Sequence, residues 1–182
     1  MKKLFVVSTF ALLLPLACGL APRSVIAAEA GTPAATPPTL ESLQAEVERL
    51  RSIMPGQAFA MTQIAYNFNN LWFAAQARNW PLAQFYLGET RVRLRWAVRI
   101  QPVRRIANGQ GQLELEPIAS ALETTQMAAV GAAIEAKDAA GFTAAYTDLM
   151  HGCQSCHEAS EKPYLKLHIP TMPAEAMIDF TP

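Results

Sequence analysis

Apolar residues recur at steps of three and four through most of the chain, which is the spacing of one face of an α-helix. This pattern predicts four long helices, over residues 57–79, 81–100 and 116–136 and from about residue 142 onward. The links between them are short, so we expect an all-α fold in which the four helices form an antiparallel bundle. No alternating strand pattern of convincing length competes with the helices, and residues 108–111 are expected to be a loop.

The same periodicity predicts which side of each helix faces the core. In the second helix the inward residues are expected to be Leu82, Phe85, Val92, Trp96 and Ile100. In the last helix the inward positions, at steps of four, three, four and three, are Phe142, Tyr146, Leu149, Cys153 and Cys156. Because this stripe leads directly into two cysteines, we expect those cysteines to lie within the helical packing.

Two further segments flank the predicted bundle. Residues 39–55 form an N-terminal accessory helix that Pro55-Gly56 ends, and its apolar stripe is either a homodimer or short coiled-coil contact or a surface that lies on its own domain. After the last helix, Leu165, Leu167 and Ile169 alternate with polar residues among several prolines. That pattern predicts an extended C-terminal tail, packed along the bundle, at the end of a domain that spans residues 57–182.

The N-terminus is typical of an export signal. Lys2 and Lys3 precede an apolar run over residues 4–16 that is too short to span a membrane, and small residues follow. We expect a signal peptide over residues 1–28, cleaved near its end, and a Pro-rich linker over residues 29–38. In the alternative, Cys18 accepts a lipid anchor, because Leu16-Ala17-Cys18-Gly19 resembles a bacterial lipobox apart from Pro15. The predicted location is therefore periplasmic or exported, with or without a membrane anchor.

Composition narrows the class of protein further. Of the 182 residues, 51% are hydrophobic and only 16% are charged, which suits a helical globular protein rather than a disordered one. The formal net charge is zero, but removing Lys2, Lys3 and Arg23 with the signal leaves 12 basic and 15 acidic residues, a net charge of −3. Nothing in this balance indicates binding to nucleic acid.

The strongest chemical signal is Cys153-Gln154-Ser155-Cys156-His157, a C-x-x-C-H sequence. This is the attachment signature of one covalent haem c, in which both thiols form thioethers and the histidine is an axial iron ligand. On a helix, residues three apart lie on one face, so both sulfurs can reach the same porphyrin edge. The alternatives are a disulfide or redox pair, or a zinc site that His151 completes.

A C-x-x-C-H sequence on the last helix of an exported four-helix domain resembles the class II c-type cytochromes, the cytochrome c′ group. The resemblance covers residues 57–182 and is most specific at residues 152–157. The segments Leu71-Trp72-Phe73-Ala74 and Asn79-Trp80-Pro81-Leu82-Ala83, with the final residues 179–182, also resemble a group of exported bacterial haem proteins of the cytochrome c family. Members of that group tend to carry histidine before the Leu-Trp pair, where this chain has Asn67-Phe68-Asn69-Asn70.

The ligand on the distal side of the iron is less determined. The class II resemblance implies that the first bundle helix covers this face, which makes Met61 the candidate distal ligand; alternatively Met61 only fills the core. Met172, Met177, His168 and His151 are weaker candidates. A third alternative is an open apolar pocket that favours binding of NO or CO.

These features favour a monohaem c-type cytochrome, not an enzyme, that passes single electrons to or from an unidentified protein partner. A gas-binding protein is the alternative from another functional class, and a peroxidase is a third, for which no acid–base residue is convincingly placed. Six arginines lie between residues 91 and 105 with no acid among them: Arg91, Arg93, Arg95, Arg99, Arg104 and Arg105. They either contact haem propionates or an acidic partner, or form a solvated face.

Overall fold

The computed structural model describes residues 37–174 and 178–182, and this part of the chain is mostly helical, as the prediction of an all-α fold requires. The predicted signal segment, with Cys18, lies outside the described residues. The helices are α1 (Leu40–Ile53), α2 (Gln57–Gln76), α3 (Trp80–Ile100), α4 (Leu115–Thr124), α5 (Gln126–Glu135) and α6 (Ala139–Ala159). None of them is both long enough and apolar enough to cross a lipid bilayer.

Helix α1 corresponds to the accessory helix that the apolar stripe predicts over residues 39–55. Thr39 precedes it, and the Thr39 hydroxyl accepts a hydrogen bond from the Ser42 amide at 3.1 Å, which satisfies one of the unpaired amides of the first turn. No residue of α1 is buried, and Leu43, Val47 and Leu50 on its stripe are exposed. A homodimer contact through this stripe stays a prediction.

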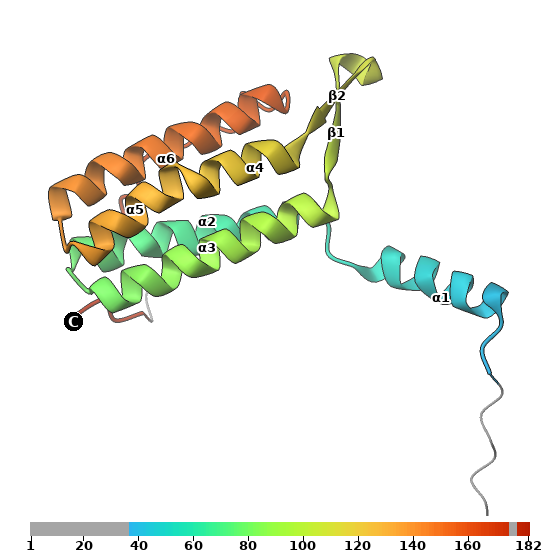
Figure 1. Cartoon of the computed structure of the whole chain (residues 1–182), viewed down its shortest axis with the longest axis horizontal. Helices are drawn as coiled ribbons and strands as arrows, with labels where there is room; N and C mark the ends of the chain where they lie inside the picture. The colour runs from blue at the N-terminus through green and yellow to red at the C-terminus, as the bar shows by residue number, and fades with distance from the viewer. Residues whose placement is uncertain (1–36, 175–177) are drawn as a thin grey trace, which may run out of the picture. The chain divides into compact units, whose positions relative to one another are not determined.

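The remaining helices form one helical body, here defined as residues 57–160, in which α2 packs on α3 and α5 packs on α6 (Figure 1). Its core is centred on the fully enclosed side chains of Phe142, Tyr146 and Leu149 on α6. The Tyr146 ring stacks on that of Phe68 with centroids 4.2 Å apart, and its hydroxyl donates to the Phe68 carbonyl at 3.0 Å. These contacts hold α6 against α2 and set its register.

Local signals in the sequence explain where the helices of the body begin. Asn79 precedes α3, where its side chain accepts a hydrogen bond from the Leu82 amide at 3.2 Å. Asp138 precedes α6, and its carboxylate accepts from the amides of Ala140 at 3.1 Å and Gly141 at 3.0 Å. Asparagine and aspartate at this position satisfy amides that have no partner within the helix.

The helix predicted over residues 116–136 is interrupted. It divides into α4 and α5 at Thr125, and in Figure 1 the two pieces follow one another along nearly one line. The Thr125 hydroxyl donates to the Ala121 carbonyl at 2.6 Å, and the Thr124 hydroxyl donates to the Ser120 carbonyl at 2.8 Å. Threonine hydroxyls that bond back in this way compete with the helix backbone, and they account for the break.

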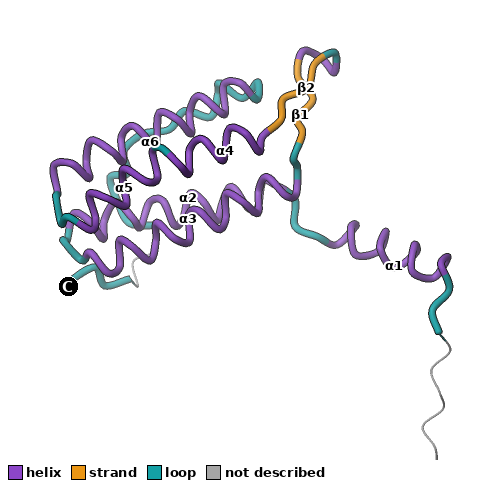
Figure 2. The backbone as a smooth tube through the Cα atoms, viewed as in Figure 1, coloured by secondary structure: helices purple, strands orange, loops and turns teal. Residues whose placement is uncertain are grey.

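The loop predicted at residues 108–111 is largely the turn of a β-hairpin, whose two short strands were not predicted. Strands β1 (Val103–Ile106) and β2 (Gly111–Glu114) pair antiparallel and form a hairpin, drawn in orange in Figure 2. A short 3₁₀ turn, Ala107–Gly109, connects them, and Gly109 adopts φ of 89°, a conformation that favours glycine. Strands of four residues are too short for alternation to reveal, although the Asn-Gly pair at residues 108–109 is a known hairpin signal.

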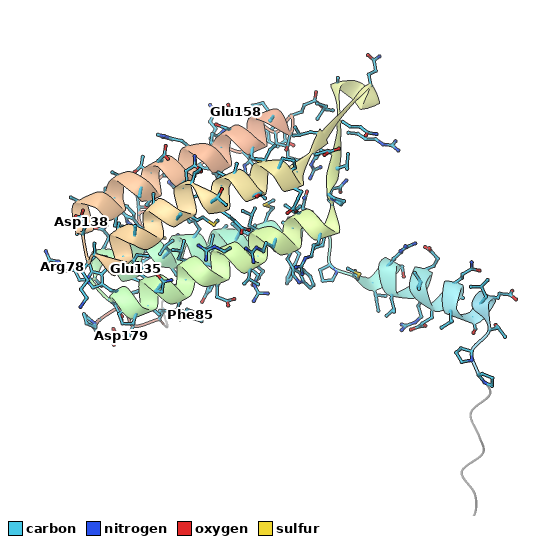
Figure 3. All side chains as sticks on the ribbon, viewed as in Figure 1. Arg78, Phe85, Glu135, Asp138, Glu158 and Asp179 are labelled. Atoms are coloured by element: carbon cyan, nitrogen blue, oxygen red, sulfur yellow. The ribbon has the colours of Figure 1, made fainter. Side chains whose placement is uncertain are left out.

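The predicted inward face of α3 is wrong at Phe85, Val92 and Trp96, whereas Leu82 does pack against the core. Phe85, Val92 and Trp96 are 57%, 46% and 40% exposed, and Phe85 lies on the outer side of α3 (Figure 3). The buried residues are Ala83, Tyr86, Leu87, Thr90, Ala97 and Val98. Both faces of α3 carry apolar residues at helical spacing, so periodicity alone does not decide between them, and the face with more small side chains is the buried one.

The chain beyond α6 forms no further helix or strand among its described residues and returns along the body, in agreement with the predicted extended tail. The Asn69 side chain donates to the Met172 carbonyl at 3.2 Å, and the Asn79 side chain donates to the Thr181 carbonyl at 2.8 Å. The Phe180 ring lies 6.0 Å from that of Phe73. The tail thereby spans from the end of α6 to the turn between α2 and α3.

Replacing Phe142, which has no exposed surface, with alanine should lower the free energy of unfolding by about 3–5 kcal/mol, because a large buried ring is lost and a cavity remains. Phe85→Ala, on the exposed side of α3, is the matched control and should change it by only about 0.5 kcal/mol. Denaturant unfolding followed by circular dichroism measures both. Equal losses would contradict the assignment of the core face.

Candidate functional site

The C-x-x-C-H sequence lies in the last turns of α6, which continues to Ala159. Gly152 precedes the first cysteine at the contact with α4. A β-carbon added at Gly152 would lie 2.5 Å from the Leu122 side chain, so glycine lets α4 and α6 approach one another there. The packing that positions the motif therefore extends to the residue directly before Cys153.

A cavity of about 740 Å³ opens beside this end of α6. It brings together Cys156 and His157 from α6 with Met61 from α2, three of the four residues predicted from the sequence to hold a cofactor. Arg104 on β1 and Leu165 and Leu167 of the tail complete its other sides. The volume falls within the range of small-molecule and cofactor pockets.

Cys153 is the fourth predicted residue, and it lies one turn earlier, outside the cavity lining. It packs against the main core, and burial raises the pKa of its thiol to about 12. Cys156 packs instead against a smaller cluster formed by Val98, Leu115 and Ala119. Burial also raises the pKa of the Cys156 thiol, although less strongly, so the two thiols differ in their environments.

The His157 imidazole is partly buried at the edge of the cavity. Burial lowers its pKa, the Leu165 backbone opposes this effect, and the positive charges of Lys162 and Arg104 add to it. Its Nδ1 atom is buried and makes no hydrogen bond. A neutral imidazole is the form that binds metals, and a lowered pKa favours that form.

These residues fit a covalent c-type haem. Cys153 and Cys156 do not form a disulfide, and His157 has a ring nitrogen without a partner. A zinc site would need a cluster of at least three His, Cys, Asp or Glu side chains, and the described residues contain none; His151 is exposed. The groups gathered here are therefore two free thiols, one imidazole and the Met61 thioether of α2.

The weaker ligand candidates lie elsewhere. His168 and Met172 line a separate groove of about 290 Å³ between α2, α6 and the tail, and Met177 lies outside the described residues. Asn67 and Asn70 of α2 are buried, and neither lines the larger cavity. Met61 is thus the sulfur ligand candidate that shares a cavity with His157.

The arginines between residues 91 and 105 make different contacts. Arg95 forms an ion pair with Glu123 of α4, with Nε 2.9 Å from the carboxylate, and Arg93 pairs with Glu89 at 3.1 Å. Arg104 alone of this group lines the cavity. Sequence reasoning did not separate Arg104 from its neighbours, because the hairpin that turns it toward the cavity was not predicted.

Comparison with family models, with curated proteins and with solved structures found no match to this chain.

In folded protein prepared without a cofactor, iodoacetamide should alkylate Cys156 at least tenfold faster than Cys153, because the Cys153 thiol is more deeply buried and its pKa is about 12. The variants Cys153→Ser and Cys156→Ser isolate the two reactions, and mass spectrometry measures the rates. In denaturant the two rates should become similar. Faster alkylation of Cys153 in the folded protein would contradict this arrangement.

Proposed function

We propose that the protein is a monohaem c-type cytochrome that transfers single electrons outside the cytoplasm. The observation that carries the proposal is that the C-x-x-C-H sequence ends a core-packed helix and opens onto a cavity that also contains Met61. The bound iron would supply the one-electron chemistry. The chain would supply two thioether attachments, through Cys153 and Cys156, and the proximal ligand His157.

The helical arrangement supports the same proposal. We infer that α2, α3, the α4–α5 pair and α6 correspond to the antiparallel four-helix bundle of the class II c-type cytochromes, with the attachment sequence on the last helix. The predicted export signal agrees, because haem attachment in bacteria takes place outside the cytoplasm. The electron partner is an unidentified protein, and Cys18, if lipidated, would hold the cytochrome at a membrane.

The packing of the partly buried Cys153 against the core has a consequence for maturation. Thioether formation needs access to the sulfur, and the Cys153 side chain packs against the core in the folded body. Attachment would therefore precede the closure of α6 onto the other helices. The folded body would then enclose the attached edge of the haem and exclude water from it.

We propose Met61 as the distal ligand, because it lines the same cavity as His157 from the facing helix α2. A methionine ligand opposite histidine raises the reduction potential, which suits an electron carrier. Binding of NO or CO is the second candidate function. It is favoured by Ala58, Thr62 and Ala65, small side chains that flank Met61 and would leave an open distal side if Met61 did not ligate.

Protein exported in cells that contain the haem-attachment machinery should gain the mass of one haem and keep it after denaturation. Cys153→Ser and Cys156→Ser should each retain at most one thioether, and the double variant should lose covalent haem. Ser155→Ala, within the motif but exposed, is the matched control and should attach haem normally. Colourless protein of unmodified mass would contradict the proposed function.

The distal ligand is tested by the absorption spectrum of the reduced haem protein. The unmodified protein should be low-spin and unresponsive to CO, and Met61→Leu should become high-spin and bind CO. Met172→Leu, on the exposed tail, serves as the control and should leave the spectrum unchanged. If the unmodified protein already binds CO and Met61→Leu changes nothing, the gas-binding function replaces the electron carrier.

A further inference from the structure

We propose that Arg104 is a pre-positioned cation that binds a carboxylate of the cavity's ligand, which on the proposed function is a haem propionate. The inference rests on that function and adds a residue to the site that the attachment sequence does not indicate.

The charges around the cavity support an anionic occupant. Its lining includes three cationic side chains, Arg104, Lys162 and Lys166, and no aspartate or glutamate. None of the three takes part in an ion pair among the described residues, whereas Arg93 and Arg95 nearby do. Cations that converge on a largely apolar cavity without acidic partners favour a ligand that carries negative charge.

Arg104 is the most firmly held of the three. Its guanidinium donates a hydrogen bond to the side-chain oxygen of Gln57, which is buried at the start of α2. The amide nitrogen of Gln57 in turn donates to the Ala97 carbonyl on α3 at 3.0 Å. This chain of contacts connects three elements and leaves the guanidinium little freedom to turn away. By contrast, Lys166 is exposed, and the Lys162 ammonium lies 3.4 Å from the Tyr164 hydroxyl.

The β1–β2 hairpin explains how Arg104 reaches this position. Successive residues of a strand point to opposite sides, so Arg104 and Arg105 diverge: Arg104 lines the cavity and Arg105 is exposed. At the tip, the Ala107 amide donates to the Glu161 carboxylate at 2.7 Å, which fixes the hairpin beside the end of α6. Glu161 is not part of the cavity lining.

Arg104 lines the same cavity as Cys156 and His157, so its charge lies on the side of the cavity that the attachment motif opens onto. A guanidinium can bind a carboxylate through two parallel hydrogen bonds, which orients the ligand as well as attracting it. A fixed positive charge near an iron centre favours the reduced state, which carries one positive charge fewer. Arg104 would therefore both orient the haem and raise its potential.

The first test measures the midpoint potential of the haem protein by spectroelectrochemistry. Arg104→Gln should shift the equilibrium about threefold toward the oxidised form, or roughly 28 mV at 59 mV per decade for one electron. Arg104→Lys keeps the charge without the planar fork and should shift it less. Arg105→Gln is the matched control. Its shift in potential should be no more than a few tenths of the shift expected for Arg104→Gln.

The second test needs no attached haem or iron. In the Cys153→Ser, Cys156→Ser protein, protoporphyrin IX should bind more tightly than its dimethyl ester, which lacks free carboxylates, as followed by quenching of tryptophan fluorescence. Adding Arg104→Gln should remove this preference and adding Arg105→Gln should preserve it. Circular dichroism verifies that each variant is folded, and Arg104→Lys supplies a second variant should Arg104→Gln unfold.

The outcomes separate the two proposals. Normal haem attachment with equal potentials for Arg104→Gln and Arg105→Gln, or an unchanged preference for the free acid in Arg104→Gln, would overturn the assignment of Arg104 and leave the cytochrome proposal intact. Failure of the unmodified protein to attach haem would overturn both.

Discussion

The position of the candidate site depends on the burial of one helical stripe. Phe142, Tyr146 and Leu149 have almost no exposed surface and hold α6 in one rotation against its neighbours. Each residue turns a helix by about 100°. A shift of the stripe by one position would therefore carry Cys153 and Cys156 away from the packed side. The apolar packing of the first half of α6 therefore determines on which side of the helix Cys153 and Cys156 lie.

The sequence predicts the parts of the molecule that local periodicity and local chemistry determine. The long helices α2, α3 and α6, and the stripe that leads into the attachment cysteines, all follow from spacing along one segment. The structure departs from these predictions where a tertiary or side-chain contact competes with the local pattern. Thr125 breaks a helix through its hydroxyl, and α3 buries the side with more small residues although its other side carries Phe85 and Trp96.

The residues of the candidate site also divide into those that the sequence predicts and those that only tertiary packing brings together. The sequence motif identifies Cys156 and His157, and the family resemblance suggests Met61; the structure places all three at one cavity. Gln57 was not predicted to act at this site, and Arg104 was predicted only as one of six arginines that contact either haem propionates or an acidic partner, or form a solvated face. Gln57 and Arg104 are 47 residues apart in sequence, and their contact exists only because a short hairpin and the start of α2 meet. No pattern within either segment contains that information, since it depends on tertiary packing alone.

The cavity also constrains how the chain reaches its final state. The cavity of about 740 Å³ at the end of the helical body has a mostly apolar lining, so a ligand that covers it would remove apolar surface from water. A ligand that binds only the folded state would stabilise that state, and a covalent ligand cannot dissociate. Because Cys153 is partly buried and packs against the core, attachment of a ligand to its sulfur after folding would need this packing to loosen. On the proposed function, attachment before α6 closes would avoid loosening this packing, so the contact of Cys153 with the core favours an order in which the ligand is attached first and enclosed as the body folds.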